Sequence, residues 1–191
     1  MRVIVEFLGE TIRIPEDFVK QIGKEILKKL LKLAAHDKSV LRVLKYVPEL
    51  EDVPGAIELY KNIAKVSSPR FRAGFIFEAD RAYYYKKLGL LERIYPLGPK
   101  SPGDLLILKD GEYIIECKVI NWQYYVKNPE RLKELEYIVN RLIKQLKELE
   151  EEYHISLGRV IVEFKYKPPE WVIEKIKQQV GEVEISWVYS R

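Results

Sequence analysis

The sequence predicts an α/β fold in which a central mixed β-sheet is flanked by helices, with a hairpin and further helices preceding it. From residue 70 onward, helix-like and strand-like stretches follow in the order α-β-β-β-α-β-α-β. Turn residues separate these stretches, and each helix-like stretch carries an apolar stripe with helical spacing. The chain has 191 residues, enough to bury roughly 70% of the surface that its unfolded form exposes.

The first 66 residues predict a hairpin followed by helices. Apolar residues alternate with polar ones over residues 3–14, and Gly9-Glu10 lies where the chain would turn. Pro15 and the two acids after it are typical of a helix start. One helix is expected there, with an apolar stripe formed by Phe18, Ile22, Ile26, Leu30 and Leu33. Shorter helices are expected over residues 39–46 and 55–66.

Ser67-Ser68-Pro69 is the clearest boundary in the sequence, and it also fits a helix start. It divides the chain into an N-terminal extension, residues 1–66, and a second domain, residues 67–191. The helices expected in the second domain cover residues 70–88, 129–153 and 168–180. The expected strands cover residues 90–95, 104–109, 113–120, 159–166 and 182–189, with a loop over residues 96–102.

A helix-ending glycine, a turn dipeptide and one stripe of apolar residues support these expected helices and strands. Gly89 is expected to end its helix in the left-handed conformation, and Asp110-Gly111 is typical of a type I′ hairpin turn. The stripe of the helix over residues 129–153 consists of Leu132, Leu135, Val139, Leu142, Leu146 and Leu149.

The composition excludes several classes of protein. No apolar run is long enough to span a bilayer, and Glu6 interrupts the N-terminus where a signal peptide would stay apolar, so an intracellular, cytoplasmic protein is expected. Cys117 is the only cysteine, which excludes an intramolecular disulfide and a cysteine zinc cluster. The bias toward Lys, Glu, Ile and Tyr resembles that of proteins from very hot environments.

Positive charge is concentrated in one part of the sequence. The chain carries a formal charge of +4, and residues 70–102 hold seven basic side chains against three acids, which is also net +4. A local positive patch suits a polyanion such as nucleic acid, although a solvated helix face gives the same pattern. The basic residues of this stretch are Arg70, Arg72, Arg81, Lys86, Lys87, Arg93 and Lys100.

An acid, a second acid and a lysine are expected at one end of the predicted hairpin over residues 104–120. Residues two apart on a strand face the same way, so Glu116 and Lys118 share one face. Pairing around the turn brings Asp104 opposite Lys118 or near it. Neighbouring carboxylates repel by roughly 4 kcal/mol at an effective dielectric of 20, and a divalent cation compensates for this. Oxygen ligands favour Mg²⁺ or Mn²⁺.

The helix before this hairpin contributes another acid. The side chains of one helical stripe include Glu78, so a carboxylate is expected on the face turned toward the core. Burial of a carboxylate is expensive unless it is paired or bound to a metal. If the helix packs against the hairpin, Glu78 reaches the same metal centre. The other residues of this stripe are Phe71, Phe75, Ala82 and Tyr85.

At these residues the chain resembles the PD-(D/E)XK nuclease superfamily, and archaeal Holliday-junction resolvases most closely. The segments that carry the resemblance are Gly74-Phe75-Ile76-Phe77-Glu78-Ala79, Pro102-Gly103-Asp104-Leu105-Leu106-Ile107-Leu108 and Ile114-Ile115-Glu116-Cys117-Lys118. The resemblance covers roughly residues 70–166. It implies a restriction-endonuclease-like sheet flanked by helices and hydrolysis of DNA, or less often RNA, phosphodiester bonds.

The resemblance also implies roles for individual residues. Asp104 and Glu116 match its metal ligands, Lys118 matches its lysine, and Glu78 matches the helical acid of many branches, which would complete the metal site. Gln145 in the later helix has no tyrosine four residues on, a departure that argues against the exonuclease branch.

The function expected from the sequence is therefore a Mg²⁺- or Mn²⁺-dependent endonuclease, a hydrolase acting on DNA and especially on structured or branched DNA. Arg72, Arg81, Lys86 and Lys87 are expected to grip the phosphate backbone. Two alternatives remain, a nucleic-acid-binding protein of the same fold that does not cut, and an RNA nuclease. Junction cutting needs two active sites, so a homodimer is expected, with residues 1–66 supplying the dimer contact or a surface for substrate recognition.

Overall fold

The computed structural model describes residues 2–7, 9–97 and 101–190, and it confirms an α/β protein with a mixed sheet flanked by helices. The five strands of this sheet follow the order β3-β4-β5-β6-β7, and a separate two-stranded sheet pairs β1 with β2. The chain divides into two compact units, residues 1–109 and 110–191. Lys100 and part of the expected loop over residues 96–102 lie outside the described residues.

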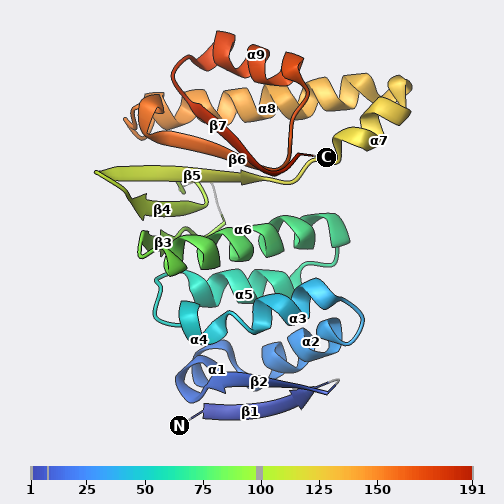
Figure 1. The fold of residues 1–191 in the computed structure, drawn as a ribbon, viewed down its shortest axis with the longest axis vertical. Coiled ribbons are helices and arrows are strands. Elements are labelled where there is room, and N and C mark those ends of the chain that lie inside the picture. Colours follow the sequence, from blue (N-terminus) through green and yellow to red (C-terminus); the bar gives the residue numbers. More distant parts are fainter. Residues whose placement is uncertain (1, 8, 98–100, 191) are drawn as a thin grey trace. The chain divides into compact units, whose positions relative to one another are not determined.

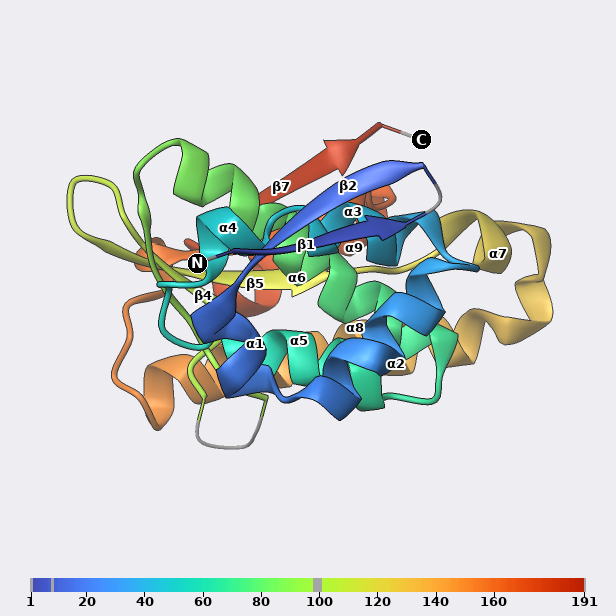
Figure 2. The ribbon, with the colours of Figure 1, turned by 90° about the horizontal axis from the view of Figure 1, so that it is seen from below.

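The first unit begins with the expected hairpin. Strands β1 and β2 are antiparallel, with Val5 opposite Ile12, and the Ile12 and Ile14 side chains are buried. In Figure 2 the hairpin lies in front of the helices that follow it. The side chains of residues 2–5 and 7 fall outside the described part. The elements of this unit are β1 (Arg2–Phe7), β2 (Glu10–Pro15), α1 (Glu16–Ile22), α2 (Lys24–Ala34), α3 (Lys38–Leu44), α4 (Val47–Leu50), α5 (Ala56–Lys65), α6 (Pro69–Lys87), β3 (Leu91–Ile94) and β4 (Leu105–Leu108).

The prediction of a single helix after Pro15 is wrong, because the helix is interrupted at Gly23. Gly23 has φ 87° and ψ 147°, so helix α1 ends at Ile22 and α2 starts at Lys24. The buried face of α2 therefore agrees with the expected stripe only at Leu30. Leu27 and Ala34 are buried in α2 in place of the expected Ile26 and Leu33, which are only half-buried.

Helix α6 begins and ends where the sequence predicts. The Ser68 side chain accepts a hydrogen bond from the Phe71 N–H, which satisfies one of the free amides of the first turn. At the other end Gly89 has φ 73°, and the Leu90 N–H donates to the Tyr85 carbonyl at 2.9 Å. A glycine in the left-handed conformation with this bond is a Schellman C-cap.

Glycine is required where helix α5 approaches strand β3. Gly55 has φ 92°, and a Cβ atom built on it would lie 1.7 Å from the Ile94 carbonyl oxygen. Beside this contact the Ile94 N–H donates to the Pro54 carbonyl at 2.9 Å. The start of α5 and the end of β3 are therefore in backbone contact inside the first unit. The expected boundary between residues 66 and 67 also falls inside this unit.

The second unit is built on three parallel strands. Strand β5 pairs with β6, and β6 pairs with β7, both in parallel. Helices α8 and α9 are the crossovers, and Figure 1 shows both on the same side of β5 and β6, as right-handed crossovers in one direction require. The elements are β5 (Glu112–Lys118), α7 (Trp122–Lys127), η1 (Pro129–Arg131), α8 (Leu132–Glu151), η2 (Leu157–Arg159), β6 (Val160–Tyr166), α9 (Glu170–Val180) and β7 (Glu184–Tyr189).

Two expectations for this unit need correction. Helix α7 was not expected, and α8 begins at Leu132 after a short 3-10 turn. The Leu132 side chain is 48% exposed although it belongs to the expected stripe, because it lies in the first turn of α8. The rest of the stripe is confirmed, with Leu135, Val139, Leu142, Leu146 and Leu149 all buried.

The turn expected at Asp110-Gly111 agrees with the structure in part. Both residues have positive φ, 53° and 126°, but the link between β4 and β5 has three residues, Lys109, Asp110 and Gly111. Among the residues that the structure describes, no helix has the length and apolar character needed to cross a membrane.

Candidate nuclease site

Strand β5 places Glu116 and Lys118 on one face of the sheet. The carboxylate oxygen Oε1 of Glu116 lies 3.0 Å from the Lys118 Nζ, and the two side chains are only 15% and 25% exposed. The alternation of a β-strand explains this geometry, because residues two apart point the same way. Ile115 and Cys117, on the opposite face, are buried. The expectation that Glu116 and Lys118 lie together is confirmed.

Helix α8 contributes a third polar side chain to this group. The Lys118 Nζ donates a hydrogen bond to the Gln145 Oε1 at 3.2 Å, so the ammonium lies between a carboxylate and an amide oxygen. At least two of the ammonium's three donors are therefore directed by the protein, which fixes where the positive charge is held. No role for Gln145 was predicted from the sequence, because its position within α8 alone does not indicate a contact with Lys118.

The register with β6 identifies the face that carries these side chains. Glu116 is aligned with Val162 and Lys118 with Phe164, and both β6 side chains are fully buried. Partners in a parallel ladder point to the same face, and the bond to Gln145 shows that this is the face covered by α8. The candidate pair therefore lies near the carboxyl end of β5, beside the α8 crossover, where open α/β sheets commonly bind ligands.

Asp104 and Glu78 belong to the first unit. Asp104 immediately precedes β4, its side chain is half-buried, and its backbone carbonyl accepts a hydrogen bond from the Tyr95 N–H at 2.8 Å. Glu78 is half-buried in the middle of α6, between the buried residues Phe77 and Ala79. Glu78 lies on the helix that the sequence predicts for it, whereas Asp104, expected as the first residue of a strand, lies one residue before β4. Whether they meet Glu116 stays a prediction.

The stripe expected around Glu78 is correct only in part. Ala82 and Tyr85 are buried, but Phe71 is 67% exposed. Helical spacing predicts which side of a helix faces its neighbours, but not how far along the helix those neighbours extend. Phe71 lies in the first turn of α6, so helical spacing could not predict its exposure.

The donor atoms available for a metal are carboxylate oxygens, which fit Mg²⁺ or Mn²⁺ and do not fit a thiolate-bound metal. Within the described residues, no three His, Cys, Asp or Glu side chains form a group that could hold a metal ion. In the second unit Glu116 is the single expected ligand. A metal site of the expected kind therefore depends on Asp104 and Glu78 of the first unit.

The four expected phosphate-binding residues all have interactions inside the first unit. Arg72 donates from Nε to the Ile63 carbonyl at 3.2 Å and from Nη2 to the Val66 carbonyl, and so caps the C-terminal end of α5. The Arg81 guanidinium lies 4.2 Å from the centre of the Tyr84 ring. Lys86 and Lys87 form ion pairs with Asp52 and Glu49, at 3.2 and 3.7 Å. The guanidinium of Arg72 therefore stabilises the first unit and is not available to bind phosphate.

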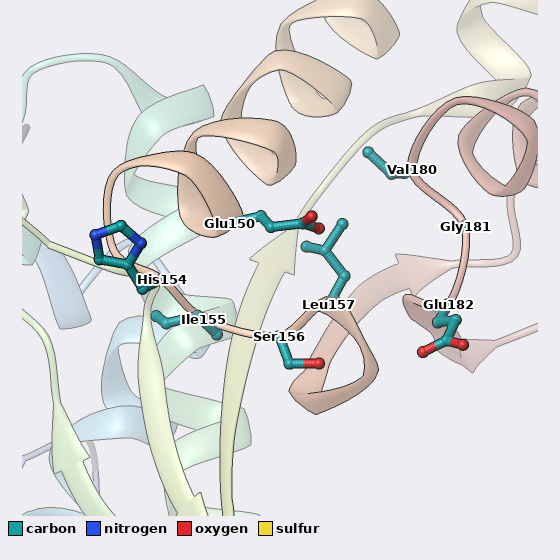
Figure 3. A pocket seen from close by; sticks show the side chains of 8 residues that line it. All are labelled: Glu150, His154, Ile155, Ser156, Leu157, Val180, Gly181 and Glu182. Carbon is teal, nitrogen blue, oxygen red and sulfur yellow. The ribbon is translucent and has the colours of Figure 1, made fainter.

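An open pocket of about 630 Å³ lies elsewhere in the second unit (Figure 3). Its lining comes from the end of α8, the link to β6 and the turn between α9 and β7. This is the amino end of β6, whereas Lys118 is aligned with Phe164, four residues further along that strand from Val160. The pocket is therefore separate from the candidate pair. Its lining residues are Glu150, His154, Ile155, Ser156, Leu157, Val180, Gly181 and Glu182.

Glu163 is an acid that the sequence analysis missed. Its side chain is 4% exposed in the middle of β6, and Oε2 accepts a hydrogen bond from the Ser186 hydroxyl at 3.5 Å. It is aligned with Cys117, so it lies on the opposite face of the sheet from Glu116. The sequence feature that could have identified Glu163 is a charged residue inside an apolar strand. Glu163 does not belong to the candidate pair, because it lies on the other face of the sheet.

Comparisons with models of known protein families, with curated proteins and with solved structures found no match for this chain. Any functional assignment therefore rests on the chemistry of the residues described above.

Proposed function

We propose that this protein is a metal-dependent nuclease of the PD-(D/E)XK kind that hydrolyses phosphodiester bonds in DNA. Asp104, Glu116 and Glu78 are its metal ligands, and Lys118 is its catalytic lysine. The observation that carries the proposal is the arrangement of Glu116 and Lys118, 3.0 Å apart on one face of β5, with Lys118 held by Gln145 of α8.

The partial burial of this pair argues for a functional role. An exposed ion pair contributes about 0–1 kcal/mol to stability, and a pair withdrawn from water often contributes no more because desolvation offsets the attraction. Glu116 and Lys118 lie at 15% and 25% exposure, among fully buried apolar neighbours such as Val162 and Phe164. A strand in that position gains more stability from apolar side chains. A role in catalysis therefore explains the partly buried Glu116–Lys118 pair better than a contribution to folding stability does.

The proposed roles follow from the chemical groups. The carboxylates of Asp104, Glu116 and Glu78 would hold a Mg²⁺ or Mn²⁺ ion. When bound, that ion would lower the pKa of a water molecule and neutralise charge on the phosphate. The Lys118 ammonium, restrained by Glu116 and Gln145, orients the attacking water or stabilises the charge that develops on the phosphate oxygens. Arg81, Lys86 and Lys87 bind the backbone of the substrate by exchanging their present partners for phosphates.

The proposal is tested by cleavage of labelled single-stranded, double-stranded and four-way-junction DNA, and of single-stranded RNA, in Mg²⁺, Mn²⁺ or EDTA. We expect metal-dependent cutting of DNA that falls by about 100-fold or more in Asp104→Asn, Glu116→Gln and Lys118→Ala, since loss of one group that stabilises developing charge has that effect. Lys147→Ala, which removes an exposed lysine from α8, is the matched control and should cut like wild type.

Each failure has a distinct meaning. Cutting that survives in all three site variants assigns the activity elsewhere in the chain or to a contaminant. If no substrate is cut while nucleic acid still binds, the chain is a binding protein that uses this fold without catalysis. Cutting of RNA alone makes it an RNA nuclease.

A further inference from the structure

Strand β7 has hydrogen-bonding capacity that the described fold leaves unused. It is the last strand in the sheet order, so among the residues that the structure describes only β6 pairs with it. The Tyr189 carbonyl accepts from the Lys167 N–H at 2.8 Å, which turns the N–H and C=O groups of residues 185, 187 and 189 toward β6. The groups of Ser186 and Val188 therefore point away from the sheet.

The usual protections of an edge strand are missing from residues 185–189 of β7. Natural edges carry lysine, proline, a bulge or a very short strand, which discourage pairing with another chain. The register of β7 with β6 is regular over six residues, and residues 185–189 are uncharged and contain no proline. Several of its side chains are exposed, among them Trp187 at 38% and Tyr189 at 54%.

An aromatic surface extends from this edge onto helix α9. The Lys167 Nζ lies 5.3 Å from the centre of the Trp187 ring and 3.8 Å from a carboxylate oxygen of Glu170. Trp171 follows Glu170 directly in the first turn of α9 and is itself 38% exposed. Exposed aromatic side chains of this kind are enriched in protein interfaces.

We propose that β7 pairs in an antiparallel manner with β7 of a second copy of this chain, about a two-fold axis at Trp187, so that the two sheets become one. In this register Ser186 of each copy exchanges backbone hydrogen bonds with Val188 of the other, and the two Trp187 residues face each other in a non-hydrogen-bonded pair. Ile185 of one copy faces Tyr189 of the other. The proposed partner of the β7 edge is thus a second copy of the same chain.

The distribution of charge fits this pairing. No charged residue lies between 185 and 189, so the axis brings no like charges together. The nearest acid, Glu184, falls opposite the uncharged Ser190 of the second copy. Like charges therefore do not face each other from Glu184 to Ser190 in this register, and a second copy fits the edge without charge repulsion.

Proline at an outward-facing position gives a selective test. Val188→Pro removes an N–H that points away from β6, which an edge strand tolerates, but it blocks pairing with a second copy. Sedimentation velocity at micromolar concentration should give twice the chain mass of 22.6 kDa for wild type and for Val188→Thr, and the single mass for Val188→Pro. Circular dichroism checks that Val188→Pro keeps its fold. A monomeric wild type, or a dimeric and folded Val188→Pro, overturns the proposal.

Cysteine cross-linking tests the register and remains informative if Val188→Pro does not fold. Non-hydrogen-bonded antiparallel partners have Cα atoms about 4.5 Å apart, within the range that a disulfide spans. In a Cys117→Ala background, Trp187→Cys should form an intermolecular disulfide under mild oxidation, whereas Tyr189→Cys, which faces Ile185 of the other copy, should not. Absence of the Trp187→Cys cross-link, or equal cross-linking of both variants, overturns the two-fold axis at Trp187. The result does not depend on nuclease activity.

Discussion

Asp80 binds two residues of the first unit, Arg42 and Tyr46, that precede it by 38 and 34 positions in the sequence. It receives two hydrogen bonds from Arg42, from Nε at 2.9 Å and from Nη2 at 2.7 Å, in the bidentate geometry that suits a guanidinium and a carboxylate. The Tyr46 hydroxyl donates to the same carboxylate at 2.9 Å. Tyr46 also stacks on Tyr83, with ring centres 4.1 Å apart. One carboxylate on α6 thus anchors the end of α3 and the residue before α4.

This network predicts a loss of stability at alkaline pH. Burial of Tyr46, together with its hydrogen bond to Asp80, raises the pKa of its phenol from 10 to about 12. The folded state therefore favours the protonated phenol more than the unfolded state does. That contribution is fully present below pH 10 and is lost as the pH rises through about 12.

The expected effect is measured as the difference in unfolding free energy between wild type and Tyr46→Phe, by urea denaturation from pH 9 to 12. The difference should shrink as the pH rises, because only wild type loses the hydroxyl contribution. Other tyrosines titrate in both proteins and cancel. A difference that is constant over this range contradicts the assignment.

At the scale of single residues, the sequence predicted what depends on local alternation and missed what depends on distant contacts. Glu116 and Lys118 share a face because they are two apart on a strand, and this could be read directly. The bond from Lys118 to Gln145 joins residues 27 apart and depends on how α8 crosses the sheet. Arg72 was assigned to phosphates because charge in a sequence does not reveal that its guanidinium meets two carbonyls of α5.

Helix α6 offers two glycines for a matched comparison. Gly74 lies in the middle of the helix with nothing within 4 Å of an added Cβ atom, whereas Gly89 has φ 73° after its end. Gly74→Ala should raise the free energy of unfolding by about 0.8–1 kcal/mol through helix propensity. Gly89→Ala should lower it by about 1–2 kcal/mol, because a left-handed conformation is unfavourable for alanine.

Both values come from urea denaturation monitored by circular dichroism, with a common m-value for the two variants. Equal effects of the same sign would show that neither the cap nor the helix interior behaves as described.

At the scale of elements, capping and turn signals proved dependable. Ser68 and Gly89 mark the ends of α6 because each satisfies backbone groups locally, and Asp110-Gly111 supplies the positive φ of the link between β4 and β5. The break at Gly23 was missed, since a glycine within an apolar stripe also occurs in continuous helices. Helix α7 was missed because six residues give too short a pattern for a period to be recognised.

At the scale of the whole chain, the order of elements was predicted and the division into units was not. The α-β-β-β-α-β-α-β order from residue 70 agrees with the structure once the short helix α7 is added. The compact unit that ends at Lys109 contains the hairpin, six helices and two strands of the five-stranded sheet. Composition favoured a boundary at Ser67-Ser68-Pro69, but Arg72 and Gly55 connect the two sides of that segment.

A substitution at Gly55 tests how strongly the stability of the first unit depends on the close approach of Gly55 to Ile94. In Gly55→Ala the new methyl group would lie 1.7 Å from the Ile94 carbonyl oxygen, which is backbone and cannot rotate away. We expect a loss of more than about 3 kcal/mol in unfolding free energy, measured by urea denaturation, because severe overpacking and backbone strain add together. Gly89→Ala, with positive φ but no close neighbour, is the control. A loss in Gly55→Ala no greater than in the control would contradict the close approach.

The contact between Gly55 and Ile94 also bears on the order in which the protein forms as it is synthesised. Gly55 is translated 39 residues before Ile94, an interval on the order of 2 to 8 seconds at typical rates of synthesis. Helix α5 and the helices before it have time to assemble in that interval, since such events take microseconds to milliseconds. Strand β3 then emerges beside helices that have already formed, so the Ile94 N–H can reach the Pro54 carbonyl before the later strands are made. The backbone contact at Gly55 would in this way form early, within a unit whose synthesis is complete at Lys109.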